Sequence, residues 1–303
     1  MKSDDSSLSP EEYAEVKRIA DALLRKADAY GKFPTPVDDI LETAQLVVDR
    51  TVSLEFQSDS IIKSFRSLVG KKARPLVSGM KKLFGLLHIP SGEIYLDQSQ
   101  HVNKQTWVKL HETGHGCIPH QKRMYQLVED GEYELDPGTE ELFEREANNF
   151  AAETLYQLDT YEKVAADYIV SIRTPMELSK KFGGSIYSSI RRYVTTHFSP
   201  IGLAVYDQVE KEAGQYLFQL RRQPIASEAF RKKYAGFTWP NPCTNGNWLW
   251  PLLRRRKLAE EIATIEDDTG VTHECEIHLF NSTHQIFVML IPVAKLPRVY
   301  GFS

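Results

Sequence analysis

The residues best suited to chemistry lie in the stretch WVKLHETGHGCIPHQ, residues 107–121, where two histidines stand four positions apart. On an α-helix, positions i and i+4 share a face, so His111 and His115 would point in the same direction. Two such imidazoles can bind Zn²⁺ through ring nitrogens at about 2.0–2.1 Å. Glu112 would then reach a water activated by the metal and act as its general base. A helix with two incidental histidines would show the same spacing, so a third ligand must decide.

A candidate third ligand lies downstream in ELFEREANNFAAE, residues 141–153. A catalytic zinc takes three protein ligands and leaves one position open. Glu144 and Asn148 share a helix face opposite an apolar stripe, so Glu144 would complete a His-His-Glu set. Asn148, one turn later, would hold a ligand histidine by a hydrogen bond. Glu141 and Glu146 are rivals, although Glu146 points about a third of a turn or more away from the Glu144–Asn148 face.

Helices and a β-hairpin are expected to position these residues. Ser9 and Glu12 form a capping box at the start of a first helix, with Pro10 at its first position. The other expected elements are a helix over 37–48, a hairpin over 81–99, the histidine helix from about Lys104, and a helix through 141–155. Residues 51–80 are ambiguous.

Together, WVKLHETGHGCI and EREANNFAAETL resemble the ImmA/IrrE family of zinc metallopeptidases, whose members pair HExxH with E-x-x-A-(N/D)-x-F-A. The resemblance covers roughly residues 10–158 and implies a minimal gluzincin-like fold. It makes His111, His115 and Glu144 zinc ligands and Glu112 the catalytic base. Thr113-Gly114 departs mildly from the apolar-Gly pair of many relatives. Many members cleave a helix-turn-helix repressor, which relieves repression of stress, phage or defence genes. The strand GEIYLDQS is expected to accept the substrate as an edge strand.

The second half of the chain suggests a sensor. ELSKKFGGSIYSSIRRYV has the helix–turn–helix pattern of a DNA-reading module, and helices that merely buttress the peptidase would look alike. The last hundred residues resemble, more weakly, the GAF-like region of IrrE-type proteins. There, basic clusters that include Arg254, Arg255 and Arg256 alternate with aromatic residues. Cations with aromatics are typical of single-stranded nucleic-acid binding, and a solvated basic surface over an aromatic core fits equally well.

Composition and cysteine usage narrow the class of protein. The 303 residues have a net charge of −4, with an acidic first half and a mildly basic second half. The three cysteines form no C-x-x-C pair, which favours a reducing compartment. No signal peptide is recognisable, and the longest apolar run is too short to span a bilayer, so we expect a cytoplasmic protein with no membrane partner. Cys243, in a turn-rich loop, is a candidate inhibitory thiol, although an inert cysteine is the simpler interpretation.

The sequence therefore predicts an α+β protein with three parts. These are a gluzincin-like metallopeptidase domain (1–160), a helical HTH-like region (161–198) and a C-terminal GAF-like α+β sensor domain (199–303). The predicted function is zinc-dependent cleavage of a helix-turn-helix repressor, regulated through the C-terminal domain, with single-stranded DNA as one possible signal. The alternative is a nucleic-acid-binding regulator with a structural or vestigial metal site. Tyr125, Tyr133 and His120 are all candidates for stabilising the oxyanion.

Overall fold

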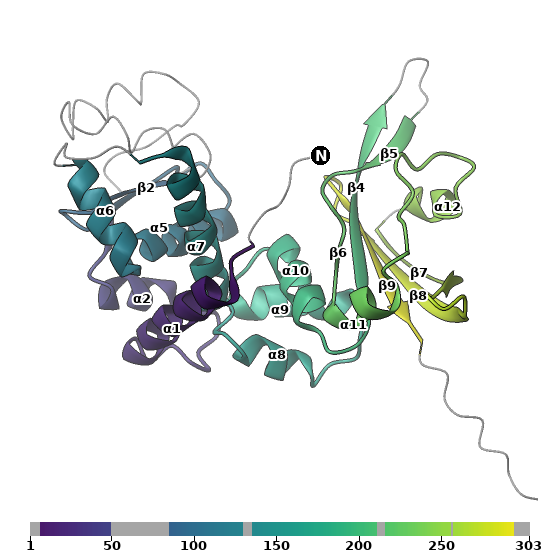
Figure 1. The fold of residues 1–303 in the computed structure, drawn as a ribbon, viewed down its shortest axis with the longest axis horizontal. Helices are drawn as coiled ribbons and strands as arrows, with labels where there is room; N and C mark the ends of the chain where they lie inside the picture. The colour runs from purple at the N-terminus through teal and green to yellow at the C-terminus, as the bar shows by residue number, and fades with distance from the viewer. Residues whose placement is uncertain (1–6, 50–84, 130–134, 211–215, 256, 294–303) are drawn as a thin grey trace, which may run out of the picture. The chain divides into compact units, whose positions relative to one another are not determined.

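The computed structural model describes residues 7–49, 85–129, 135–210, 216–255 and 257–293 (Figure 1). The chain divides into two compact units. The first, called the N-terminal unit below, comprises Asp5–Lys163 and Leu178–Ser188. The second, called the C-terminal unit, comprises Val164–Glu177 and Ser189–Ser303. Helices and two sheets occur in the part of the chain described, so the predicted α+β class is confirmed.

Helix α1 opens the N-terminal unit as the capping box predicts. The Ser9 hydroxyl accepts a hydrogen bond from the Glu12 N–H, and the Glu12 carboxylate accepts one from the Ser9 N–H. Helix α7 (Pro137–Leu155) is also capped at its start. The Asp136 carboxylate accepts hydrogen bonds from the N–H groups of Gly138 and Thr139. Among the described residues, the helices that begin before residue 164 are α1 (Pro10–Lys26), α2 (Val37–Thr43), α5 (Val102–Cys117), α6 (Pro119–Glu129), α7 (Pro137–Leu155) and α8 (Thr160–Ala165).

A small sheet lies beside the histidine helix. Its strands are β1 (Val47–Asp49), β2 (Gly85–His88) and β3 (Glu93–Leu96), in the order β1-β3-β2. β2 and β3 form the predicted antiparallel hairpin, and β1 runs parallel to β3. The sheet packs on α5 through a cluster of Leu41, Leu87, Ile94, Leu96 and Val108.

Two expectations about this sheet were wrong. The helix expected over 37–48 ends at Thr43. Gln45 follows with φ +61°, which breaks the helix, and the β-branched Val47 and Val48 then pair with β3. The strand within GEIYLDQS is β3, which lies between β1 and β2 and therefore is not an edge strand. The ambiguous stretch 51–80 lies outside the described residues.

The C-terminal unit contains an antiparallel sheet of order β5-β4-β9-β8-β7, with β6 paired to β4. The predicted final hairpin is β8 with β9, in which Ile277 lies opposite Leu290. One face of the sheet is covered by a core that includes Phe218, Phe230 and Trp250. The elements are β4 (Gly202–Glu210), β5 (Tyr216–Leu220), β6 (Ile225–Ala226), α11 (Glu228–Lys233), α12 (Trp250–Leu253), β7 (Leu258–Glu266), β8 (Thr272–Asn281) and β9 (Ile286–Pro292).

The helix–turn–helix elements expected around residue 183 are present. α9 (Arg173–Phe182) ends before Gly183, whose φ of +79° suits glycine, and α10 (Ile186–Thr196) follows. The Ser185 hydroxyl accepts a hydrogen bond from the Ser188 N–H, as an N-cap does. On α10, Arg192 is buried and Arg191 is partly buried, so neither side chain stands out freely for reading a DNA groove. A DNA-reading role for these helices stays a prediction.

Within the described ranges, no helix combines the length and the apolar character needed to cross a membrane.

Candidate metal centre

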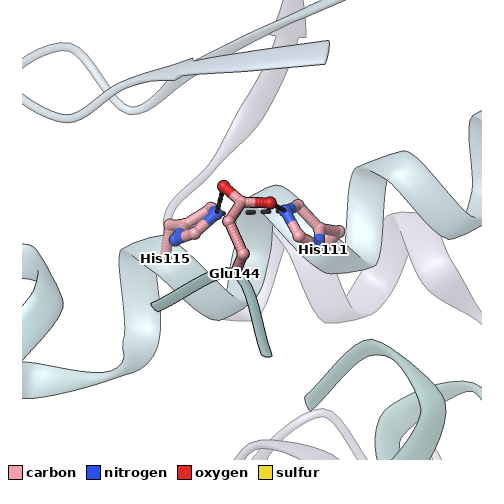
Figure 2. Close-up of side chains that lie close together, drawn as sticks. All are labelled: His111, His115 and Glu144. Carbon is pink, nitrogen blue, oxygen red and sulfur yellow. Dashed lines mark hydrogen bonds and ion pairs between the residues drawn. The ribbon is translucent and has the colours of Figure 1, made fainter. Parts of the chain in front are cut away.

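Helix α5 brings the two histidines of the motif together inside the N-terminal unit. His111 is fully buried and His115 is 6% exposed. Their Nε2 atoms lie 3.0 Å apart. Glu144, on α7, places one carboxylate oxygen 3.6 Å from Nε2 of His111 and the other 3.7 Å from Nε2 of His115. Figure 2 shows this carboxylate lying between the two imidazole rings.

The spacing of these donor atoms fits a tetrahedral metal ion. Ligand atoms about 2.05 Å from a tetrahedral zinc are about 3.3 Å from one another. The three donor-to-donor distances, 3.0, 3.6 and 3.7 Å, lie on either side of that value. Among the described residues, His111, His115 and Glu144 are the one group of three or more His, Cys, Asp or Glu side chains placed to hold a metal.

Hydrogen bonds on the far side of each ring orient the histidines. Nδ1 of His111 lies 3.2 Å from Oδ1 of Asn148, and Nδ1 of His115 lies 2.6 Å from Oε1 of Gln121. An amide oxygen only accepts, so each Nδ1 must carry the proton and each Nε2 is left with a lone pair. The Nε2 lone pairs of both rings thus point toward the Glu144 carboxylate. These electron-rich atoms repel one another unless a cation lies between them. Asn148 thus lies within hydrogen-bonding distance of His111, and its role in supporting a metal ligand stays a prediction.

Burial keeps both imidazoles neutral. It lowers the pKa of His115 to about 4, and it lowers the pKa of His111 with a further contribution from the nearby His115 ring. Neutral imidazole is the form that binds a metal. The donors are two neutral imidazole nitrogens and one carboxylate. This set fits a divalent ion such as zinc.

Glu112 lies next to the centre and is 5% exposed. In the metal-free chain, burial raises the pKa of Glu112 to about 8, and the negative charge of Glu144 acts in the same direction. A hydrogen bond from the Leu87 backbone, on β2, opposes this rise. A cation in the centre would favour the ionised form of Glu112. Glu112 is thus held beside the three candidate ligands and is not part of that group.

A glycine allows α5 and α7 to approach closely enough for the three ligands to meet. A Cβ atom at Gly114 would lie 3.1 Å from Cα of Ala147 and 3.2 Å from Cδ1 of Phe150, both on α7. The first of these atoms belongs to backbone and cannot turn aside. The Thr113-Gly114 pair of the motif therefore fits the packing, since Thr113 turns its hydroxyl to the Lys109 carbonyl of its own helix.

The rival glutamates do not join the ligand cluster. Glu146 is 4% exposed, and its carboxylate accepts hydrogen bonds from Nε2 of Gln121 at 2.5 Å and from Nε2 of His120 at 2.7 Å. Glu141 is exposed. Sequence reasoning did not identify Gln121 as a partner of His115. The two residues lie on different helices, α6 and α5, which are separated at Ile118, so no helical spacing relates them.

Of the three oxyanion candidates, Tyr125 lies against His115, one of the candidate ligands. Its ring packs edge-on to His115 with ring centroids 5.5 Å apart. Burial raises the pKa of Tyr125, and Glu144 and Glu112 raise it further, so its hydroxyl stays a hydrogen-bond donor. His120 instead pairs with Glu146. Tyr133 lies outside the described residues.

The basic and aromatic residues singled out near the C-terminus are only partly available to a ligand. Arg254 donates from Nε to the Tyr216 hydroxyl at 2.8 Å, and Arg255 forms an ion pair with Glu261. Arg256 lies outside the described residues. Most of the aromatic residues are part of the core or packed against it, whereas Trp248 is 46% exposed. The expected stacking surface is therefore much smaller than the sequence suggested.

Cys243 lies in the core of the C-terminal unit. Its side chain is fully buried, and its backbone pairs with that of Phe218 in an isolated β-bridge. Burial raises the pKa of the Cys243 thiol to about 11, so the thiol is protonated near neutral pH. A buried, protonated thiol is a poor metal ligand, which argues against the inhibitory role expected from its loop sequence.

A histidine pair and a glutamate on adjacent helices, with a buried glutamate beside them, define a centre of the metallopeptidase kind. The comparison with protein families agrees. Residues 72–191 match the model of the IrrE N-terminal-like domain, Peptidase M78. The resemblance to ImmA/IrrE proteins is thereby confirmed.

No curated protein matches the chain. Eleven chains of solved structures match it. One of these is a Mycobacterium tuberculosis transcriptional regulator, with 11% sequence identity and a TM-score of 0.49 over 95% of this chain and 93% of that one.

Proposed function

We propose that this chain is a zinc-dependent endopeptidase with His111, His115 and Glu144 as ligands. The observation that carries the proposal is the convergence of two bare imidazole nitrogens and a carboxylate in a buried site. Glu112 favours catalysis over a purely structural metal, because a structural site has no use for a buried carboxylate beside its ligands. This feature argues against the alternative of a regulator with a structural or vestigial site.

The roles of the residues follow from their positions. A zinc ion bound here would polarise the scissile carbonyl and acidify a water molecule. Glu112 would accept the proton of the attacking water and pass it to the leaving amine. The Tyr125 hydroxyl, on the side of His115, would donate a hydrogen bond to the oxygen that becomes negatively charged.

We propose a helix-turn-helix repressor as the substrate, a class suggested by the match of residues 72–191 to the IrrE N-terminal-like domain. Scission would fall in an extended segment of that repressor. Because β3 is the middle strand of those described, the extended segment would pair with β2 instead. β2 is well placed for this, since its Leu87 backbone bonds to Glu112 and a Cβ at Gly85 would lie 3.3 Å from the Glu112 carboxylate.

The C-terminal unit would regulate cleavage, and single-stranded DNA is the signal we test. Arg254 and Arg255 lie near aromatic residues of the β5–α12 region, with Trp248 exposed close by in the sequence. Guanidinium groups attract phosphates, and an exposed indole can stack on a base.

The proposed function is tested by incubating the purified chain with a candidate repressor, chosen as a small helix-turn-helix protein encoded beside it. Cleavage is expected with Zn²⁺ and is expected to stop in a chelator. Glu112→Gln should retain zinc and lose about 10²–10⁴-fold in rate, because the amide cannot accept the proton. Cleavage by Glu112→Gln at the wild-type rate would remove Glu112 from the proposed role.

A further inference from the structure

We infer that Gln121 is a positioning residue for the metal ligand His115, and that the buried carboxylate of Glu146 sets the orientation of its amide. The inference rests on the proposed metal centre. Neither Gln121 nor Glu146 is one of the proposed ligands or the proposed base, and the inference assigns them a role in preparing one ligand before any metal arrives.

The first step concerns the direction of the Gln121 amide. Gln121 is fully buried, and its Nε2 atom lies 3.2 Å from the Phe143 carbonyl and 2.5 Å from a carboxylate oxygen of Glu146. Both neighbours only accept hydrogen bonds. The NH₂ group must therefore face them, and the amide oxygen must face the other way.

The second step concerns the proton on His115. The Gln121 oxygen faces Nδ1 of His115 at 2.6 Å and can only accept. Nδ1 must therefore carry the proton, and Nε2 of the neutral ring is left bare. That atom is the one that faces His111 and Glu144. The orientation of one amide thus decides which ring nitrogen is available to the metal.

The third step concerns what holds Glu146. This carboxylate is 4% exposed and accepts hydrogen bonds from Gln121 and His120, the latter at 2.7 Å. A buried carboxylate requires such donors. Asn148 plays a comparable part at His111, where its Oδ1 lies 3.2 Å from Nδ1 of that ring. At His115, the contacts from His120 to Glu146 and from Glu146 to Gln121 fix the direction of the Gln121 amide.

The test uses Gln121→Met, which keeps the approximate volume and removes the hydrogen bonds, in the full-length chain. The primary readout is the tautomer of His115 in the metal-free protein, from ¹⁵N correlations of a histidine-labelled sample. His115→Asn identifies the signal. We expect the Nδ1–H tautomer in the wild type and a shift toward Nε2–H in Gln121→Met. The second readout is Zn²⁺ affinity by chelator competition, expected to fall about 10–100-fold.

Gln157 supplies a matched control in the same unit. It is also fully buried, and its amide bonds to Gly31, Lys32 and Thr35, away from the ligands. Gln157→Met should lower stability without moving the His115 tautomer or the Zn²⁺ affinity. If Gln121→Met left both readouts unchanged, or if Gln157→Met changed them equally, the inference would be overturned.

A second variant separates orientation from mere packing. Glu146→Gln keeps the shape but offers a donor as well as an acceptor, so the Gln121 amide is free to turn over. We expect a mixed tautomer at His115 with Gln121 still in place, and an unchanged tautomer would contradict the role of Glu146. Failure of the proposed function can be told apart from failure of this inference. A wild-type chain that binds no zinc would contradict the proposed function, and its His115 tautomer could still be measured.

Discussion

In the metal-free protein, Glu112 should make the N-terminal unit less stable as the pH rises toward 8. Burial raises the folded-state pKa of this carboxyl to about 8, from the ordinary value of 4.5. A raised folded pKa means that the folded state keeps a proton that the unfolded state has lost. The corresponding stability is fully present below pH 4.5 and is lost as the pH rises through 8.

The histidines of the centre act in the opposite direction at lower pH. The pKa of His115 is lowered from 6.5 to about 4, so the stability linked to it is present above pH 6.5 and lost as the pH falls through 4. Between pH 4.5 and 6.5 the two effects oppose each other. Between 6.5 and 8 only Glu112 contributes among these groups. Over these 1.5 pH units the folded state holds one more proton than the unfolded state. The free energy of unfolding therefore falls by about 2 kcal/mol.

The assay is chemical unfolding at several pH values in the presence of a chelator, comparing the wild type with Glu112→Gln. Gln cannot ionise, so the variant should gain about 2 kcal/mol over the wild type between pH 6.5 and 8. Glu141→Gln, which replaces an exposed carboxylate on the neighbouring α7, is the control and should follow the wild type. Parallel curves for Glu112→Gln and wild type over this window would refute the reasoning.

Two further predictions concern packing and regulation. Gly114→Ala should cost about 1–3 kcal/mol and weaken zinc binding, because the new methyl group would push α7 and Glu144 away from α5. Gly116→Ala, which would meet flexible leucine side chains instead, should cost less, and equal effects in unfolding and zinc titrations would contradict this account. Replacement of Arg254, Arg255 and Arg256 by Ala should lower the affinity for a single-stranded oligonucleotide and flatten its dependence on salt, with zinc content unchanged. A fluorescence titration that shows no binding by the wild type even at low salt would leave a protein or small molecule as the signal.

Sequence reasoning succeeded where the chemistry depends on helical periodicity. The i, i+4 spacing of His111 and His115 and the face shared by Glu144 and Asn148 both follow from 3.6 residues per turn, and the structure brings all four together. The capping box at Ser9 and the β2–β3 and β8–β9 hairpins follow from equally local rules.

What the sequence could not supply depends on tertiary contacts. Gln121 reaches His115 only because the chain turns at Ile118 and α6 folds back, and Glu146 meets it from another helix. The position of β3 in the middle of its sheet depends on the parallel pairing of β1, for which three residues leave little local signal. Near the C-terminus, the same aromatic residues suit a core or a binding surface, and the fold places most of them in the core.

Zinc content tests the central claim most directly. The wild type and Glu144→Ala are purified, loaded and dialysed against a weak chelator, and their metal content is measured by mass spectrometry. The wild type should retain about one Zn²⁺ per chain, and Glu144→Ala should lose most of it, since two imidazoles alone hold zinc weakly. Full occupancy of Glu144→Ala would contradict the His-His-Glu centre.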